Sequence, residues 1–246
     1  LNSIKEKKLF GMIIPKKYGG LELNHHEQSQ IVQKISTASN PLGVIIMVPN
    51  SLGPAELLLK YGTEEEKEKY LEGLAHGKYI PCFGLTGQHS GSDAANMLDT
   101  GVLIEKKGKK FVKLNISKRY ITLAPISNLV GVAFKLSDPN GLLEKGKEGI
   151  TLALLEPGKM NFEIGNRHNP MDVPFPNGTI VANNLEIPIE SLIGGEENAG
   201  NGWRMLMECL AVGRSISLPA CAVGRAKLTT NYVGAYSVYR KQFKTI

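Results

Sequence analysis

The sequence predicts an α+β fold in which helices come first, strands follow and a helix comes last. Three observations support this order. Residues 22–79 read as helices, apolar positions alternate from about residue 80 onward, and the spacing becomes helical again after Gly202. The predicted domains are a helical one, a β-domain and the start of a second helical one, over residues 1–79, 80–198 and 199–246.

The first region contains two helical signals in succession. Apolar positions recur in residues 26–35, and residues 55–61 are predicted to form a short apolar helix that ends at Gly62. Thr63 and Glu66 then form a capping box, because the hydroxyl and the carboxylate satisfy opposite backbone amides at the start of the next helix.

The middle region is predicted to consist of short strands separated by turn residues. A succession of strands without intervening helices indicates a small antiparallel barrel or sandwich. The lysine-rich run 106–110 falls where a hairpin turn is expected, so we interpret it as a solvated turn rather than a nucleic-acid contact. The predicted strands cover residues 111–116, 128–135 and 149–155.

The last region is predicted to begin with a largely apolar helix. Residues 205–216 contain few polar side chains, which indicates a helix buried on most sides. Trp203, the only tryptophan, is expected to anchor the start of this helix in the core. In the absence of any ligand role, Arg214 would pair with a carboxylate such as Glu208 or with one elsewhere in the chain.

The composition is consistent with a globular chain and excludes little else. At 246 residues with 42% hydrophobic content, the chain can bury a sizeable core. Its three cysteines have no metal-binding spacing and are predicted to be buried thiols, with no metal site. The net charge of +6 is dispersed, which argues against a nucleic-acid partner. No apolar run of transmembrane length and no signal peptide is recognised, and the start without methionine suggests a piece of a longer protein.

Several polar residues are expected to have no chemical role. His25, His26 and His168 have no partners at ligand spacing, so we expect them on the surface or in loops. Glu186 and Glu190 are expected to lie in a polar loop and not to form a catalytic carboxylate pair.

Two segments carry the candidate chemistry. Residues 83–93, with the sequence FGLTGQHSGSD, leave a predicted strand and turn through glycines and hydroxyl residues, which let the backbone approach a ligand closely. Residues 118–122, KRYIT, place an aromatic ring beside a hydroxyl at strand spacing, which suits a flat heterocycle. Each segment alone is also typical of an ordinary turn or of sheet packing.

Together with three further segments, this pair resembles the acyl-CoA dehydrogenase family of flavoenzymes. Residues 11–20 are similar to an N-terminal turn of that family, and residues 201–214 and 240–243 are similar to two of its C-terminal motifs. Residues 48–54 and 120–125 resemble the large bacterial type that degrades long-chain fatty acids. The resemblance implies an N-terminal helical domain, a β-barrel middle domain and a C-terminal four-helix domain, of which only the start is present.

The resemblance also implies an activity. It is the α,β-dehydrogenation of fatty acyl-CoA thioesters of medium or long chain in β-oxidation, with FAD as hydride acceptor while a base removes the α-hydrogen. The Thr86 hydroxyl would meet the flavin pyrimidine, Tyr120 would pack on the ring, and Thr122 would lie near its N5 atom. The implied FAD-binding residues are Phe83, Leu85, Thr86, Gly91, Ser92, Tyr120, Ile121 and Thr122, with Arg240 and Phe243 reaching the FAD of a neighbouring subunit. The implied substrate-binding residues are Ser92, Gly213 and Arg214.

The chain departs from the family pattern at three positions. Gly87 stands where the first signature has a glutamate, and Asn96 stands where that signature has a small residue. Most members carry the catalytic glutamate late in the C-terminal domain, and a minority carry it just before the arginine that matches Arg214. That place is Gly213 here, so the base is expected beyond Ile246 and the piece alone is expected to be inactive.

The implied partners are a fatty acyl-CoA, an electron-transfer flavoprotein and a second copy of the chain, in a homodimer or a higher oligomer. The expected location is the cytoplasm, with peripheral attachment to a bacterial inner membrane as a variant. Three other interpretations stay open: an acyl-CoA oxidase or flavin monooxygenase on the same fold, a non-catalytic module that binds acyl-CoA or a partner, and an inert truncation.

Overall fold

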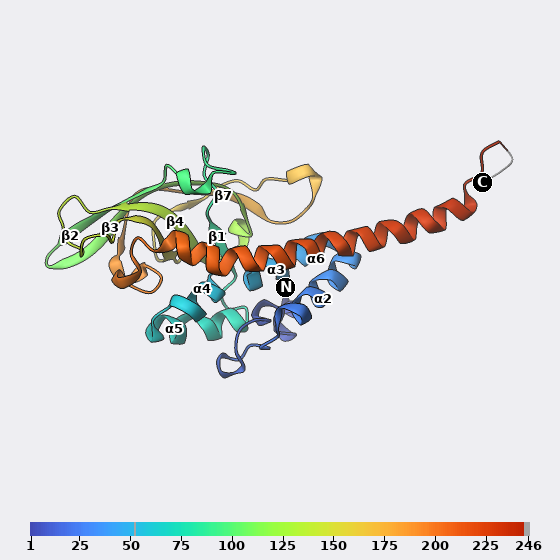
Figure 1. Cartoon of the computed structure of the whole chain (residues 1–246), viewed down its shortest axis with the longest axis horizontal. Helices are drawn as coiled ribbons and strands as arrows, with labels where there is room; N and C mark the ends of the chain where they lie inside the picture. Colours follow the sequence, from blue (N-terminus) through green and yellow to red (C-terminus); the bar gives the residue numbers. More distant parts are fainter. Residues whose placement is uncertain (52, 244–246) are drawn as a thin grey trace.

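The computed structural model describes residues 1–51 and 53–243, and of Val212 only the backbone. Leu52 and residues 244–246, which fall within predicted segments, lie outside the described residues. The helical, β and helical order of the sequence is confirmed (Figure 1).

The N-terminal region is helical, as predicted. The helix α4 ends at Tyr61, directly before Gly62. Thr63 caps α5: its Oγ1 accepts a hydrogen bond from the Glu66 amide at 3.2 Å, and Glu66 Oε2 accepts one from the Thr63 amide at 2.8 Å. The five helices are α1 (Asn2–Glu6), α2 (His25–Ala38), α3 (Asn40–Ser51), α4 (Pro54–Tyr61) and α5 (Glu64–Ala75).

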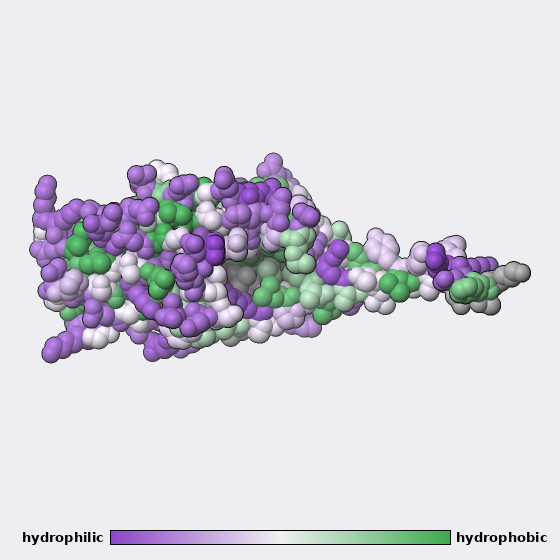
Figure 2. Space-filling view, turned by 90° about the horizontal axis from the view of Figure 1, so that it is seen from above, coloured by the Kyte–Doolittle hydropathy of each residue, from purple (hydrophilic) through white to green (hydrophobic). Residues whose placement is uncertain are grey.

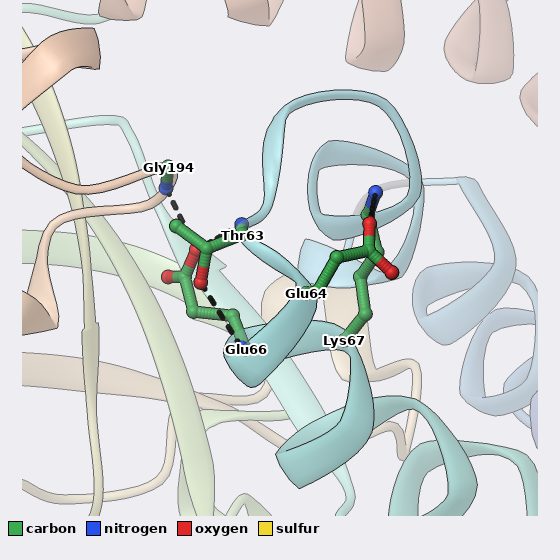
Figure 3. Close-up of polar contacts among 5 residues, drawn as sticks. All are labelled: Thr63, Glu64, Glu66, Lys67 and Gly194. Atoms are coloured by element: carbon green, nitrogen blue, oxygen red, sulfur yellow. Dashed lines mark hydrogen bonds and ion pairs between the residues drawn. The ribbon is translucent and has the colours of Figure 1, made fainter.

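The capping box does more than start α5. The same Glu66 oxygen accepts a hydrogen bond from the Gly194 amide at 2.9 Å, as Figure 3 shows. Gly194 follows the last strand of the sheet, so a local helix signal also joins the helical region to the β-region. On the other side of the turn, Lys67 pairs with Glu64 at 2.7 Å, with Glu64 largely exposed.

The strands form one seven-stranded sheet in the order β1-β4-β2-β3-β7-β6, with β5 paired to the other edge of β4. All three predicted strands are confirmed, as is the exposed hairpin turn at Lys107 and Gly108. The strands are β1 (Pro81–Gly84), β2 (Thr100–Lys106), β3 (Lys109–Thr122), β4 (Leu129–Ser137), β5 (Gly149–Leu155), β6 (Glu163–Ile164) and β7 (Asn177–Pro188).

The sheet differs from the predicted antiparallel arrangement in one respect. β1 pairs with β4 in parallel over residues 129–132, and β2 pairs with β4 in parallel over residues 135–137. The two strands therefore lie end to end along one edge of β4, because the connection of residues 85–99 leaves that edge and returns to it in the same direction. The sheet is mixed and curls into an incomplete barrel (Figure 1).

Glu186 also differs from the expectation. It lies on β7 rather than in a loop, and its carboxylate pairs with Lys106 at 2.6 Å across the surface. Glu190 lies in the short 3-10 turn that follows, Ile189–Ser191, and is exposed.

The last helix, α6 (Gly202–Tyr239), packs on α2, α3, α4 and β5. The prediction of a helix buried on most sides is wrong, because only one face meets the rest of the chain. Trp203 is 36% exposed and Leu218 46%, so the tryptophan starts the helix without entering the core. The outer part of α6 stands clear of the body and carries hydrophobic residues among polar ones (Figure 2).

Gly213 lies where α6 crosses α3. A Cβ atom at this position would lie 2.4 Å from the carbonyl oxygen of Ser51, so no side chain fits without separating the two helices. One turn further, the Ser217 and Ser51 hydroxyls bond at 2.7 Å.

The three cysteines, Cys82, Cys209 and Cys221, are free and buried, as predicted. Burial raises the pKa of the Cys82 thiol to about 12. Two stretches, Asn40–Tyr61 and Gly202–Tyr239, are long and apolar enough to cross a membrane by length and composition, although the sequence predicted none. In Asn40–Tyr61, 71% of the most apolar part is buried inside the protein, as is usual for the core helices of globular proteins.

Candidate functional site

A cavity of about 110 Å³ lies where β1 and β3 end beside α3 and α6. It brings together three residues from each of the two candidate segments, although the segments are distant in the sequence. It also contains Val48 of α3, a buried aliphatic residue that the sequence marked only as the start of the segment 48–54 and not as a site residue. The lining residues are Val48, Phe83, Leu85, Thr86, Tyr120, Ile121, Thr122 and Arg214.

The two candidate segments are joined directly through their backbones. Gly87 and Lys118 form an antiparallel bridge, and the Arg119 amide donates a hydrogen bond to the Thr86 carbonyl at 3.1 Å. The Arg119 guanidinium donates to the Gln88 carbonyl at 3.0 Å. The glycine-rich turn is therefore attached to β3, and the attachment sets Thr86 beside Tyr120.

The cavity offers an aromatic ring and two hydroxyls. The Tyr120 ring is 57% exposed, although aromatic residues on strands are usually half-buried by packing. The Thr86 and Thr122 side chains make no hydrogen bond within the part of the chain that the structure describes. Thr122 pairs across the sheet with Asn177 of β7.

His168 is closer to the cavity than predicted. It lies in the loop between β6 and β7, as expected, but its ring packs edge-on against Tyr120 with centroids 4.9 Å apart. Its Nδ1 atom is buried without a hydrogen-bond partner, and so is Oδ1 of Asn177. The sequence did not signal this contact, because 48 positions separate the two rings.

Arg214 projects from α6 into the lining of the cavity. It makes no ion pair or hydrogen bond with any other described residue, so the alternative of a pair with Glu208 is wrong. Glu208 instead contacts Tyr61, Lys60 and Arg204. Residues six apart on a helix point in different directions, which separates Glu208 from Arg214.

The other predicted site residues lie elsewhere. Gly91 and Ser92 are exposed at the tip of the turn that connects β1 to β2, and Gly213 is buried against α3. Arg240 follows the end of α6, and Phe243 is 91% exposed near the far end of the chain (Figure 1). None of these five residues lines the cavity.

The cavity contains no acid or base of the carboxylate type among the described residues that line it. Likewise, within residues 1–51 and 53–243, no three side chains of His, Cys, Asp or Glu lie together in a way that could hold a metal ion. The site therefore offers the exposed aromatic ring of Tyr120, two hydroxyls, one cation and apolar walls that include Phe83.

Comparisons with known proteins show which proteins this chain resembles in sequence and in fold. Residues 1–78 match the family model described as "Acyl-CoA dehydrogenase, N-terminal domain". The acyl-CoA dehydrogenase of Bacillus subtilis (strain 168) is 33% identical over 236 residues, which cover 96% of this chain and 59% of the relative. Butyryl-CoA dehydrogenase from Megasphaera elsdenii superposes with a TM-score of 0.84 at 26% identity, covering 98% of this chain and 61% of that one. The chain is therefore similar in sequence and in fold to acyl-CoA dehydrogenases, and its first 78 residues match the N-terminal domain of that family.

The same family includes a solved FAD complex. The acyl-CoA dehydrogenase of Bacillus anthracis, complexed with FAD, superposes with a TM-score of 0.84 at 26% identity, covering 99% of this chain and 40% of that one. The chain thus spans about three-fifths of the length of the B. subtilis and M. elsdenii acyl-CoA dehydrogenases.

The cavity of this acyl-CoA dehydrogenase homologue fits part of a flavin. Two unpaired hydroxyls and an exposed tyrosine ring line it, and the unsatisfied buried atoms of His168 and Asn177 lie close to Tyr120 and Thr122, so the site combines hydrogen-bond donors and acceptors that suit a flat ring with polar edges. At about 110 Å³, however, the cavity is smaller than the few hundred Å³ typical of sites that enclose a ligand. The lining residues fit the edge of the ring, with the remainder lying on the open surface.

Proposed function

We propose that the chain is the FAD-binding part of an acyl-CoA dehydrogenase that acts on medium- or long-chain fatty acyl-CoA thioesters in β-oxidation. The observation that carries this proposal is the convergence of Thr86, Tyr120, Thr122 and Arg214, from three separate elements, on one cavity. A glycine-rich turn or a tyrosine on a strand is common when it occurs alone. Here both border one cavity together with two unpaired hydroxyls and a guanidinium, and this combination is specific.

Each residue has a role that follows from its chemistry. Tyr120 supplies an exposed aromatic face for packing against a flat ring. The hydroxyls of Thr86 and Thr122 donate hydrogen bonds to polar atoms at the ring edge. When bound, FAD would supply the hydride acceptor that no amino-acid side chain can replace.

The substrate side of the site rests on Arg214. Its guanidinium is unpaired within the described residues and borders the cavity, so it can hold an anionic or carbonyl group of a thioester substrate. Since none of the described lining residues carries a carboxylate, we expect the proton-abstracting base to come from outside them. Gly213, which stands where a minority of the family place that base, has no room for a side chain.

The proposed assembly follows from the last helix. Arg240 and Phe243 follow the end of α6 and do not line the cavity of their own chain, and we propose that they reach the cofactor of a neighbouring subunit in a homodimer or a higher oligomer. An electron-transfer flavoprotein is the proposed electron acceptor. The proposed location is the cytoplasm or the inner face of a bacterial membrane.

The first test is a titration of the 246-residue chain with FAD, followed by flavin fluorescence and absorbance. The proposal expects saturable binding that weakens in Thr122→Val, and no bleaching when palmitoyl-CoA is added under anaerobic conditions. A chain that is folded but shows no saturable FAD binding would overturn it. Fast reoxidation in air of dithionite-reduced, protein-bound flavin would favour the oxidase or monooxygenase alternative.

A second candidate function is a non-catalytic module that binds acyl-CoA. The absence of a carboxylate from the described lining of the cavity favours it. Isothermal titration with palmitoyl-CoA separates the two: saturable acyl-CoA binding by a chain that binds no FAD supports the module and contradicts the flavoenzyme.

A further inference from the structure

A buried ion pair contacts the backbone of Leu85, one of the residues that line the cavity. The Lys118 ammonium is 2.6 Å from Oδ2 of Asp99, and the two side chains are 0% and 5% exposed. A fully buried lysine is rare unless it is paired, because removing an ammonium ion from water has a large free-energy cost. A pair at this depth therefore calls for an explanation in terms of what it holds in place.

The pair closes the turn between β1 and β2 at both ends. Lys118 Nζ donates a hydrogen bond to the Leu85 carbonyl at 3.0 Å, at the start of the turn. At its end, Asp99 Oδ1 accepts from the Ser117 amide at 2.8 Å, and the Asp99 carbonyl accepts from the Lys135 amide at 2.9 Å. The ion pair thus joins both ends of residues 85–99 to β3, and the backbone of Asp99 joins the second end to β4.

The closed turn is the one that borders the cavity. Leu85, whose carbonyl accepts from Lys118, and the next residue, Thr86, both line it. Lys118 also lies two positions before Tyr120, on the strand that forms the opposite side. A displacement of the ion pair would therefore move the two sides of the cavity relative to each other.

Gly87 shows where a second carboxylate could lie. A Cβ atom at Gly87 would be 3.1 Å from Asp99 Oδ2 and 2.9 Å from the Ser90 hydroxyl. A side chain that starts at position 87 therefore begins next to the carboxylate of Asp99. The signature that this turn resembles has a glutamate at position 87, whereas here the carboxylate at that place comes from Asp99, twelve residues later.

We propose that Lys118 and Asp99 are positioning residues that hold Leu85 and Thr86 at the cofactor cavity, and that Asp99 supplies the carboxylate that position 87 lacks. The identity of the cofactor rests on the proposed function, but the positioning of the turn does not. Lys118 acts through Leu85 and Asp99 through Lys118, so neither residue needs to touch the bound cofactor.

The test relocates the carboxylate. The variants are Asp99→Asn, Asp99→Ala and the double variant Gly87→Glu with Asp99→Ala, all in the 246-residue chain. Glu186→Ala is the matched control, because Glu186 pairs with Lys106 at the same 2.6 Å on the surface of the same sheet. Two properties are measured: amide hydrogen exchange of residues 85–99 without ligand, and FAD affinity from fluorescence titration.

Asp99→Asn and Asp99→Ala are expected to speed exchange in residues 85–99 at least tenfold and to weaken FAD binding about tenfold. The double variant is expected to restore both to within about threefold of the wild type, and Glu186→Ala to change neither. If Asp99→Ala does not fold, Asp99→Asn keeps the shape of the side chain and decides the positioning role.

Unchanged exchange in residues 85–99 of Asp99→Asn would overturn the positioning role. A folded double variant that is no better than Asp99→Ala would overturn the relocation of the carboxylate. If the wild type binds no FAD, the proposed function fails, while the exchange measurements still decide whether this pair holds the turn.

Discussion

Two lysine–carboxylate pairs of the same length lie in the β-sheet of this chain. Lys106 and Glu186 are 2.6 Å apart near the hairpin turn, and their side chains are 54% and 38% exposed. Lys118 and Asp99 are also 2.6 Å apart, but they are buried and contact the backbone of Leu85, which lines the cavity. Because water screens the first pair and not the second, equal distances correspond to very different consequences for stability.

The comparison shows that the two ends of one sheet differ in how far their charged side chains are exposed to water. Near the hairpin, the charged side chains of Lys106 and Glu186 are exposed to solvent. A substitution there is therefore expected to have little effect on the free energy of unfolding. Near the cavity, the charges of Lys118 and Asp99 are buried, and each has a defined structural partner. Burial lowers the pKa of the Lys118 ammonium, and Asp99 acts against that shift by favouring the charged form. The predictions below test this contrast, starting with the largest expected effect.

Lys118→Met is expected to reduce the free energy of unfolding by about 3–5 kcal/mol, because it leaves the buried Asp99 carboxylate without its cation. Urea unfolding followed by circular dichroism measures the change. A loss below about 1 kcal/mol would mean that the buried pair behaves like a surface pair, and the comparison would fail. Lys106→Met is the control for the exposed pair, and it should change the free energy of unfolding far less.

The buried thiol of Cys82, on β1, is expected to make the free energy of unfolding depend on pH. Its pKa is raised from 9.0 to about 12, so the unfolded chain loses this proton first and stability falls as pH rises from 9 to 12. Cys82→Ala removes this term, which amounts to up to about 4 kcal/mol over that range. Unfolding curves of the two proteins from pH 8 upward should converge. Curves that stay parallel would show that the thiol ionises freely in the folded state.

Thr122→Val is expected to weaken FAD binding about fivefold, corresponding to one hydrogen bond of roughly 1 kcal/mol, with the fold unchanged. Thr100→Val, at an exposed position on β2, is the matched control and should leave the affinity unchanged. Fluorescence titration measures both. Equal affinities in the two variants would remove Thr122 from the proposed site.

Glu186→Gln is expected to change the free energy of unfolding by less than about 0.5 kcal/mol, and the small change should disappear at 1 M salt. Urea unfolding at low and high ionic strength measures it. A larger effect that resists salt would place the exposed pair in the same class as the buried one.

Much of the secondary structure could be predicted because its signals are local. The capping box of Thr63 and Glu66 spans three residues, and the turn at Lys107 and Gly108 interrupts two stretches of alternating apolar residues. Gly62 ends α4 directly after the last apolar turn. In each case the partners of a hydrogen bond lie within a few positions, so the sequence pattern and the structure depend on the same residues.

The pairing of the strands could not be predicted in the same way. β1 and β2 lie parallel to β4 because residues 85–99 leave one edge of that strand and return to it, and no alternation of apolar residues records this path. The exposed face of α6 has a similar cause: an apolar helix reads as buried, whether or not another element covers each of its faces.

The sequence by itself determined the order of helices and strands, the two candidate segments and the chemistry that their side chains can offer. Only the tertiary structure decided that Arg214 and Val48 border the same cavity as Thr86 and Tyr120, that His168 packs on that tyrosine, and that the carboxylate beside Gly87 belongs to Asp99. The physical reason is that these contacts join residues distant in the chain, and side-chain burial and strand pairing bring them together only after the sheet and α6 have packed.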